Sequence, residues 1–520
     1  MAAPTQRNSA RWAVCGAAVA LTLMAAAIAI PSVSDLNPSV LSFPPLHAKW
    51  QPRVGPGTIP ALMLAAIAIA YAGSAASRLP WSRLLVATFG FGAAWMVSLA
   101  TVDGLAGIGE ILDSDYEYLV TARTVTDISA TLHEFVERIP YSHPDNWQVH
   151  IAGHPPGALL FFVLLVSIGL GSGLAAGFVV LLLGATTPVA VLVTLRVLGG
   201  ESVARSVAPF LVFGPAAIWV AVSGDGFFAA VAAWGLCCLA MAATREARWP
   251  AAGWAVAAGL LLGYCVMLSY GLPLLAFLAI AVLVAARNFR PLPWAAVAAL
   301  FVVLVFAAAG FAWWEAYPVL RERYWDGVAS RRPTAYWIWG NIAALSFSAG
   351  PVLGASIAAV AHRAWTDRKV LGIGRRLGPS ERHVSAPVQP SASARPLPVG
   401  SSNPVSSATA ELDLADTGYG GMAAPSGGFR GRVLISARPD PAASAAATRT
   451  AMLVMLGALL CVLAADLSGM SKAEVERIWL PFVPWLLVGC GLLDSRMRQA
   501  GLVLNIGCAL VVQHLLFTGW

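Results

Sequence analysis

Apolar residues fill long blocks of this chain, and most polar residues are collected in a few intervals between the blocks. A block of roughly 20 apolar residues can cross the hydrocarbon core of a bilayer as a helix. The pattern therefore predicts an all-α protein, a polytopic transmembrane helical bundle of about 13 spans. The predicted spans cover residues 12–30, 59–77, 84–102, 174–195, 206–222, 226–243, 250–269, 272–286, 294–313, 341–360, 450–466, 478–493 and 500–517.

The composition excludes an ordinary soluble protein. Of the residues, 58% are hydrophobic and only 11% are charged, whereas a soluble domain is about 25% charged. The net charge of +7 is typical of topology signals rather than of nucleic-acid binding, because the arginines are paired at the ends of predicted spans. We therefore expect membrane lipids, and no nucleic acid, as partners.

The paired arginines also predict an orientation in the plasma membrane. With a cytoplasmic N-terminus, each short inner loop carries two arginines, as the positive-inside tendency requires. These pairs are Arg78 and Arg83, Arg196 and Arg205, Arg245 and Arg248, Arg287 and Arg290, and Arg496 and Arg498. The scheme requires the apolar run 158–170 to lie at the outer membrane surface, because it is short for a span. The alternative is an ordinary short span, which would invert everything downstream.

The same pattern divides the chain into five parts. Residues 1–102 hold three N-terminal spans, 103–173 an outer acidic loop with juxtamembrane helices, 174–361 a transmembrane core, and 450–520 a C-terminal module of three spans. Residues 362–449 are rich in Pro, Ser, Ala and Gly and have no apolar period, which predicts a disordered cytoplasmic linker.

The outer loop from Asp103 to Pro155 carries nine acidic residues and two arginines. Within it, apolar residues recur at a spacing of three and four, which predicts an amphipathic helix. They are Val125, Ile128, Leu132, Phe135, Val136 and Ile139. With this stripe against the bilayer, the helix would lie in the plane of the interface. It would serve as an anchor or as one wall of a substrate groove.

Four acidic residues, Asp103, Asp115, Glu117 and Asp225, are candidates for catalysis. A carboxylate at the boundary between membrane and water is partly desolvated, so its pKa can rise and it can act as a general base. The plainer alternative for the three loop acids is a solvated surface. Asp225 lies between two glycines, so the alternative for it is a turn former.

Histidines and an arginine complete the candidate site. His154 begins the tetrapeptide His-Pro-Pro-Gly, whose prolines fix the backbone and start a helix, and His150 precedes it by four residues. The alternative is a helix start with an incidental histidine. Arg477 stands at the mouth of a predicted span, where it could reach lipid headgroups or bind a phosphate in fork geometry. Further candidates for substrate or phosphate binding are His150, Arg331, Glu474 and Glu476.

Together, the acidic loop with its amphipathic helix, the His-Pro-Pro-Gly start and the hairpin with Asp225 resemble the GT-C superfamily of polytopic membrane glycosyltransferases. Relatives are protein O-mannosyltransferases, aminoarabinose transferases, and arabinofuranosyl- and mannosyltransferases of actinobacterial envelopes. The resemblance covers residues 103–245 and, more weakly, extends to 493. It implies transfer of a sugar from a polyprenyl-phosphate donor to a glycan or lipid acceptor of the cell envelope on the outer membrane face. An acidic loop residue would be the base, arginines would stabilise the departing phosphate, and configuration would invert.

Two features depart from the common pattern of that family. The acidic loop follows the third span, and no adjacent Asp-Asp pair exists, which leaves the base open between Asp103 and Asp115. No cofactor follows from the sequence, although a divalent cation could bind the phosphate. No metal site is predicted, because the seven cysteines lie in apolar runs without metal-ligand spacing.

Two other functions compete with glycosyl transfer: a transporter or lipid flippase, and a non-catalytic scaffold for envelope assembly. Transporters place ionisable residues near the middle of the membrane. Here the predicted spans are nearly free of charge, and polar residues collect on one face. That distribution favours chemistry at the surface.

Overall fold

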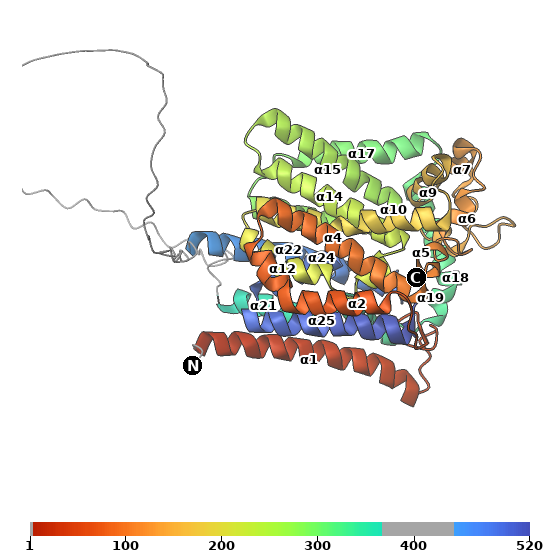
Figure 1. Cartoon of the computed structure of the whole chain (residues 1–520). Helices are drawn as coiled ribbons and strands as arrows, with labels where there is room; N and C mark the ends of the chain where they lie inside the picture. Colours follow the sequence, from red (N-terminus) through yellow and green to blue (C-terminus); the bar gives the residue numbers. More distant parts are fainter. Residues whose placement is uncertain (1–3, 367–440, 520) are drawn as a thin grey trace, which may run out of the picture. The chain divides into compact units, whose positions relative to one another are not determined.

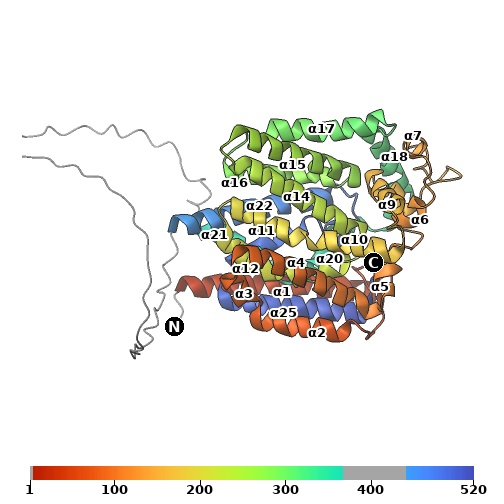
Figure 2. The same cartoon turned by 45° about the horizontal axis from the view of Figure 1, so that its top comes forward.

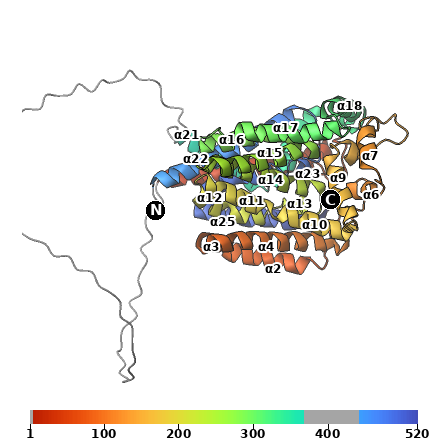
Figure 3. The ribbon, with the colours of Figure 1, turned by 90° about the horizontal axis from the view of Figure 1, so that it is seen from above.

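The computed structural model describes residues 4–366 and 441–519, in which nearly all regular structure is helical. Its long helices run side by side, and shorter helices gather at one end of them (Figure 1). Figures 2 and 3 show this from two other directions. Among the helices at this end, here called the polar end, are α6 (Tyr118–Ala122), α7 (Ile128–Glu134), α9 (Gly157–Ser167) and α18 (Trp313–Asp326).

Seven helices in the described ranges are long and apolar enough to cross a membrane, and each overlaps a predicted span. They are Asn8–Val33, Thr58–Arg78, Trp81–Asp103, Gly173–Val197, Gly224–Thr244, Arg248–Leu268 and Ala442–Leu467. Two bent pairs would raise the number to nine if each pair is one span. The chain is therefore a membrane-spanning helical protein with seven to nine candidate spans, and thirteen spans are not confirmed.

The two bent pairs include most of residues 314–340, the interval between the spans predicted at 294–313 and 341–360. Helix α17 (Leu292–Ala308) turns by 75° into α18, and α20 (Thr334–Ser348) turns by 103° into α21 (Val352–Thr366). Most of residues 314–340, which the polarity pattern assigned to a loop, are thus helical. These residues carry aromatic and arginine side chains to the polar end.

Proline explains one predicted span that is not a single helix. The span predicted at 206–222 is broken near Pro215, between α12 (Glu201–Val212) and α13 (Ala217–Val220). Proline lacks an N–H and disfavours a helical conformation in the residue before it. The span predicted at 478–493 is likewise divided into short helical pieces. Irregular backbone of this kind is tolerated at membrane depth where protein surrounds it.

The amphipathic helix predicted in the first outer loop is shorter than its apolar stripe, and its placement in the plane of the interface is not confirmed. Helix α7 ends at Glu134, and Phe135 and Ile139 are fully buried in the protein core. The Phe135 carbonyl accepts a 2.9 Å hydrogen bond from Trp147 Nε1, and Arg323 donates to the Ile139 carbonyl. The later part of the stripe, including Leu132, Phe135 and Ile139, thus packs into the protein core, whereas Ile128 near its start is 47% exposed.

The described C-terminal helices join the same compact unit as the rest of the described chain. Helix α22 (Pro441–Leu467) packs against α16 (Ala276–Ala286), and η4 (Leu487–Leu492) packs against α12. Of the predicted linker, residues 362–366 and 441–449 are helical, and 367–440 lie outside the described residues. The only strands in the described ranges, β1 (Lys49–Trp50) and β2 (Leu516–Phe517), pair antiparallel.

Candidate functional site

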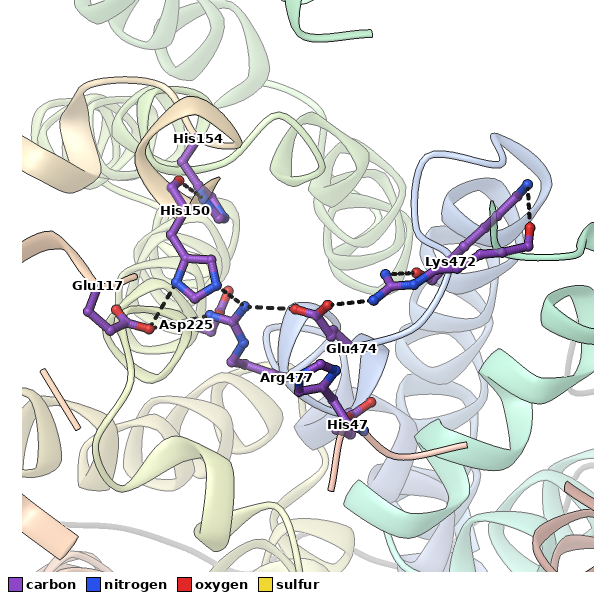
Figure 4. A network of polar contacts seen from close by, with 10 residues as sticks. His47, Glu117, His150, His154, Asp225, Lys472, Glu474 and Arg477 are labelled. Atoms are coloured by element: carbon purple, nitrogen blue, oxygen red, sulfur yellow. Dashed lines mark hydrogen bonds and ion pairs between the residues drawn. The ribbon is translucent and has the colours of Figure 1, made fainter. Parts of the chain in front are cut away.

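Arg477 is the centre of a buried ionic network at the polar end. It lies on α23 (Val475–Ile478) and is 2% exposed. Its Nη1 atom is 3.0 Å from Asp225 Oδ2 and 3.8 Å from Glu117 Oε1. Its Nη2 atom is 3.4 Å from Glu474 Oε2 and 3.1 Å from His150 Nε2 (Figure 4). One guanidinium thus binds side chains from three distant segments of the chain.

His150 joins this arginine to Glu117. Its Nδ1 lies 3.1 Å from Glu117 Oε1. Since an arginine N–H can only donate, His150 Nε2 must accept from Arg477, and Nδ1 must carry the ring proton and donate to Glu117. This assignment rests on the hydrogen-bond network. His150 is therefore held between the Arg477 guanidinium and the Glu117 carboxylate.

The start of a long helix fixes the position of Asp225. It lies in the first turn of α14 (Gly224–Thr244), where a carboxylate is favoured by the helix dipole. The Ser223 hydroxyl caps that turn by accepting from the Gly226 backbone N–H at 3.1 Å. A Cβ at Gly226 would come within 2.2 Å of the Val220 carbonyl oxygen, so this close approach requires glycine. The Gly-Asp-Gly sequence begins a helix and aims its acid at Arg477.

The backbone before α23 is strained. Ala473 and Glu474 have φ angles of +69° and +62°, in the left-handed region that residues other than glycine rarely adopt. Asn341 Oδ1 accepts from the Ala473 backbone N–H at 3.2 Å, and Arg332 Nη2 lies 3.0 Å from Glu474 Oε1. Such strain persists where surrounding contacts hold it, and it collects at functional sites.

The charges in the network support one another. Burial raises the pKa of Glu474, but Arg332 and Arg477 outweigh it and hold that pKa at about 2. Burial also raises the pKa of Glu117, yet His150 and Arg477 bring it below its ordinary value. Burial lowers the pKa of Arg477, but the carboxylates of Asp225 and Glu117 outweigh this effect, so the pKa lies above its ordinary value. Both glutamates are therefore ionised at neutral pH.

A cavity of about 300 Å³ opens beside this network. Its polar lining includes His150, His154, Arg332, Lys472, Glu474 and Arg477, and its other walls include Tyr270, Leu274, Tyr317, Leu320 and Tyr324. Three permanent cations thus face it against one carboxylate. Lys472 Nζ donates to the carbonyls of Ala329 and Arg332 at 3.2 and 3.0 Å, and it lies 4.5 Å from the Trp325 ring centroid.

His154 also lines this space. Its Nδ1 lies 2.8 Å from the His150 carbonyl oxygen, so Nδ1 carries the proton and Nε2 is the acceptor. Burial lowers the pKa of His154 more than Asp225 raises it. The ring is consequently neutral at pH 7. The following Gly157 lets α9 approach α15 (Arg248–Leu268), since a Cβ there would lie 2.4 Å from the Met267 carbonyl oxygen.

Six of the ten predicted site residues converge here: Glu117, His150, His154, Asp225, Glu474 and Arg477. Asp103 instead pairs with Arg53 at 2.5 Å in a different cavity. Asp115 and Arg331 are exposed at the surface. Glu476 is buried, and its Oε1 accepts from the His47 backbone N–H at 3.0 Å.

Two cations of the cavity, Arg332 and Lys472, are not among the ten predicted site residues. Arg332 adjoins the exposed Arg331, and nothing in the local pattern distinguishes the two. Lys472 carried a usable signal, because it is one of only three lysines and lies between the spans predicted at 450–466 and 478–493. In the described ranges, no group of three or more His, Cys, Asp or Glu side chains is arranged to hold a metal ion. A role for a divalent cation stays a prediction.

Comparison with models of known protein families, with curated proteins and with solved structures finds no match to this chain. The resemblance to GT-C glycosyltransferases therefore rests on the sequence features alone.

Proposed function

We propose that this chain is a membrane glycosyltransferase that moves a sugar from a polyprenyl-phosphate donor to a glycan or lipid acceptor of the cell envelope. The observation that carries the proposal is the Arg477 network at the wall of a cavity lined by three cations and His154. The paired arginines at the ends of predicted spans support an extracytoplasmic location of this site in the plasma membrane.

The cavity suits a lipid-linked phosphate. Arg332, Lys472 and Arg477 can neutralise an anion, and the planar guanidinium groups match phosphate oxygens. Leu274 and Leu320 provide apolar wall beside these cations, where an isoprene chain can pack. A polyprenyl phosphate has an anionic head and an apolar chain, and this cavity offers cations for the head and apolar wall for the chain.

Aromatic side chains complete the donor site. Tyr317 stacks on Trp313 with ring centroids 5.3 Å apart and an interplanar angle of 4°, and the Tyr270 centroid lies 5.9 Å from that of Tyr317. Tyr270 and Tyr317 both line the cavity. Flat aromatic faces of this kind can pack against a sugar ring or an isoprene unit.

His154 is the best placed general base. Glu474 also lines the cavity, but with a pKa of about 2 its carboxylate is a poor proton acceptor. His154 is neutral, and its proton on Nδ1 is held by the His150 carbonyl, so Nε2 can accept. Glu117 and Asp225 act as positioning residues, because they hold His150 and Arg477.

The proposed reaction is a single displacement. The acceptor hydroxyl gives its proton to His154 Nε2 as its oxygen forms a bond to the anomeric carbon. The bond from that carbon to the phosphate oxygen breaks on the opposite side, and the electron pair leaves with the phosphate. Arg477 and Lys472 stabilise the charge that develops there. Attack opposite to the leaving group inverts the configuration.

The distribution of buried charge argues against a transporter or flippase. In residues 4–366 and 441–519, the buried charged or imidazole side chains are Glu117, His150, His154, Asp225, Arg323, Arg332, Lys472, Glu476 and Arg477. Asp225 is the only one within the seven unbent candidate spans, and it lies in the first helical turn. Arg323 lies in α18, the second helix of a bent pair and part of the polar end. A transport path would need ionisable groups near the middle of the spans.

Transfer from radiolabelled polyprenyl-phosphate hexoses and pentoses to extracted envelope glycans tests this proposal in reconstituted membranes. His154→Gln is expected to lower kcat by at least about 100-fold, the size of a lost general base. His133→Gln is the matched control, because His133 Nδ1 makes the same 2.8 Å contact with a carbonyl four residues earlier, on an exposed helix. Its transfer rate should stay within about twofold of the parent.

The pH profile adds a readout that a structural role would not move. Because the pKa of His154 lies below 6.5, kcat should be constant at neutral pH and fall on the acid side as Nε2 becomes protonated. His154→Gln should lose that acid limb. Absence of transfer by the parent, or equal transfer by the parent and His154→Gln, would overturn the proposal.

A further inference from the structure

We propose that a second cavity at the polar end, built around the Arg53–Asp103 ion pair, is a binding site for an uncharged carbohydrate. The proposal deepens the proposed function, on which it rests, since the carbohydrate would be the acceptor glycan. The cavity has a volume of about 310 Å³. Its polar lining includes Arg53, Asp103, Glu110, Ser114 and Gln513, and it also contains the Phe517 ring.

The charges of the two cavities differ in sign. Three permanent cations and one carboxylate line the cavity beside Arg477, whereas one cation and two carboxylates line this one. A phosphate would meet net repulsion from Asp103 and Glu110 here. The two cavities are therefore expected to select different chemical classes, an anionic lipid in the first and an uncharged ligand in the second.

The side chains present donors and acceptors in fixed positions. Arg53 Nε lies 2.5 Å from Asp103 Oδ1, and Gln513 Nε2 donates to Asp103 Oδ2 at 3.4 Å. Carboxylate, guanidinium and amide groups are planar, and together they can accept from and donate to adjacent hydroxyls. The Arg53 guanidinium carbon lies 5.5 Å from the Phe517 ring centroid, so an aromatic surface adjoins these groups. A polyol with one apolar ring face matches this combination.

The backbone holds Arg53 in place. Strands β1 and β2 pair Lys49 with Phe517 and Trp50 with Leu516. Beyond them, the Arg53 backbone N–H donates to the His514 carbonyl at 2.8 Å, and Arg53 Nη1 donates to the Leu516 carbonyl at 2.6 Å. Pre-organised groups lose little conformational entropy when they bind a ligand. The site is therefore built before any ligand arrives.

Short segments connect this cavity to the Arg477 network. Ser114 lines the cavity, and Glu117 of the network follows it by three residues. Val222 lines the cavity, and Asp225 follows it by three residues. A glycan bound here would thus lie against the same two segments that hold Arg477. That placement suits an acceptor whose terminal hydroxyl extends toward the donor.

Binding of labelled neutral oligosaccharides of hexose and of pentose to the purified full chain tests the site without any transfer step. At least one probe should bind the parent, and Arg53→Met should weaken its binding by at least 10-fold. Gln513→Leu should also weaken it, and this variant leaves the Arg53–Asp103 ion pair intact, so it guards against a folding defect. Lys472→Met, in the first cavity, should instead weaken binding of polyprenyl phosphate.

The outcomes separate the two proposals. If a probe binds the parent but not Arg53→Met, and the parent shows no transfer activity, the carbohydrate site is supported and the glycosyltransferase proposal is refuted. If transfer occurs, Arg53→Met should raise the KM for the acceptor at least 10-fold and leave the KM for the donor unchanged. The carbohydrate site would be overturned if no probe binds the parent, or if the parent, Arg53→Met and Gln513→Leu bind it equally. An unchanged KM for the acceptor in Arg53→Met would also overturn it.

Discussion

Arg477 offers the sharpest test of the structure, because one guanidinium compensates several buried carboxylates. In Arg477→Gln, Glu474 keeps Arg332 as a partner at 3.0 Å, but Asp225 and Glu117 lose their arginine contacts at 3.0 and 3.8 Å. Removing one partner of a buried ion pair typically costs about 3–5 kcal/mol. Asp225→Asn is milder, since Arg477 retains Glu117 and Glu474. A lost hydrogen bond to a charged group costs about 1.5–3 kcal/mol.

These costs convert into measurable shifts of the unfolding midpoint. At an unfolding entropy of about 2.1 cal/mol/K per residue, a chain of 520 residues loses roughly 1 °C per kcal/mol. Arg477→Gln should therefore lower the midpoint by about 3–5 °C and Asp225→Asn by about 1.5–3 °C. The double variant should be more stable than Arg477→Gln alone, because removal of one carboxylate relieves the uncompensated charge.

Thermal unfolding in detergent, followed by the fluorescence of the 19 tryptophans, measures these shifts. Every variant has to be scanned at the same rate, because membrane proteins often unfold irreversibly. Arg321→Gln is the matched control, since it makes the same substitution at an exposed position of α18 and should leave the midpoint nearly unchanged. If Asp225→Asn destabilises as much as Arg477→Gln, or if the double variant is less stable than Arg477→Gln, Arg477 does not compensate these buried carboxylates.

Two further predictions concern the same end of the molecule. Burial raises the pKa of Glu476 to about 7. The folded state therefore retains a proton that the unfolded chain releases above about 4.3. The free energy of unfolding should consequently fall as pH rises from about 4.5 to 7. Glu476→Gln should therefore raise the unfolding midpoint relative to the parent at pH 8 but not at pH 5, and an equal effect at both pH values would contradict this origin. Gly157→Ala should lower the midpoint, because its Cβ would meet the Met267 carbonyl oxygen at 2.4 Å. Gly253→Ala, where the space is open, should instead stabilise α15 by about 0.5–1 kcal/mol, and equal shifts in the two alanine variants would show that the contact between α9 and α15 is not tight.

The length of the apolar blocks in the sequence was enough to predict that the chain is helical and spans a membrane. Every one of the seven long apolar helices overlaps a predicted span, because hydrophobic length alone decides whether a helix can cross a bilayer. The number of spans did not follow from it. Prolines, bends and packing divide several apolar blocks into short pieces, and hydropathy does not register these breaks.

The inward packing of residues 135–139 shows the same limit. Their apolar period is compatible both with lipid and with protein as the apolar partner. Burial of the Phe135 and Ile139 side chains in the protein core decides between the two, and Trp147 and Arg323 donate hydrogen bonds to the carbonyls of these residues. Arg323 is separated from Ile139 by 184 residues in sequence, so no local window contains the information.

Residue chemistry identified the kinds of groups in the site, while long-range folding selected among them. The acidic, imidazole and guanidinium candidates could be listed from polarity alone, yet the sequence left the base open between Asp103 and Asp115 and did not single out Glu117. Only Glu117 contacts His150 and Arg477, and those two residues are 327 positions apart. A buried charge is stable only beside its partner, and that partner is brought near by the packing of whole helices. Pattern along the chain therefore specifies which segments enter the membrane, and three-dimensional packing specifies which polar side chains share one pocket.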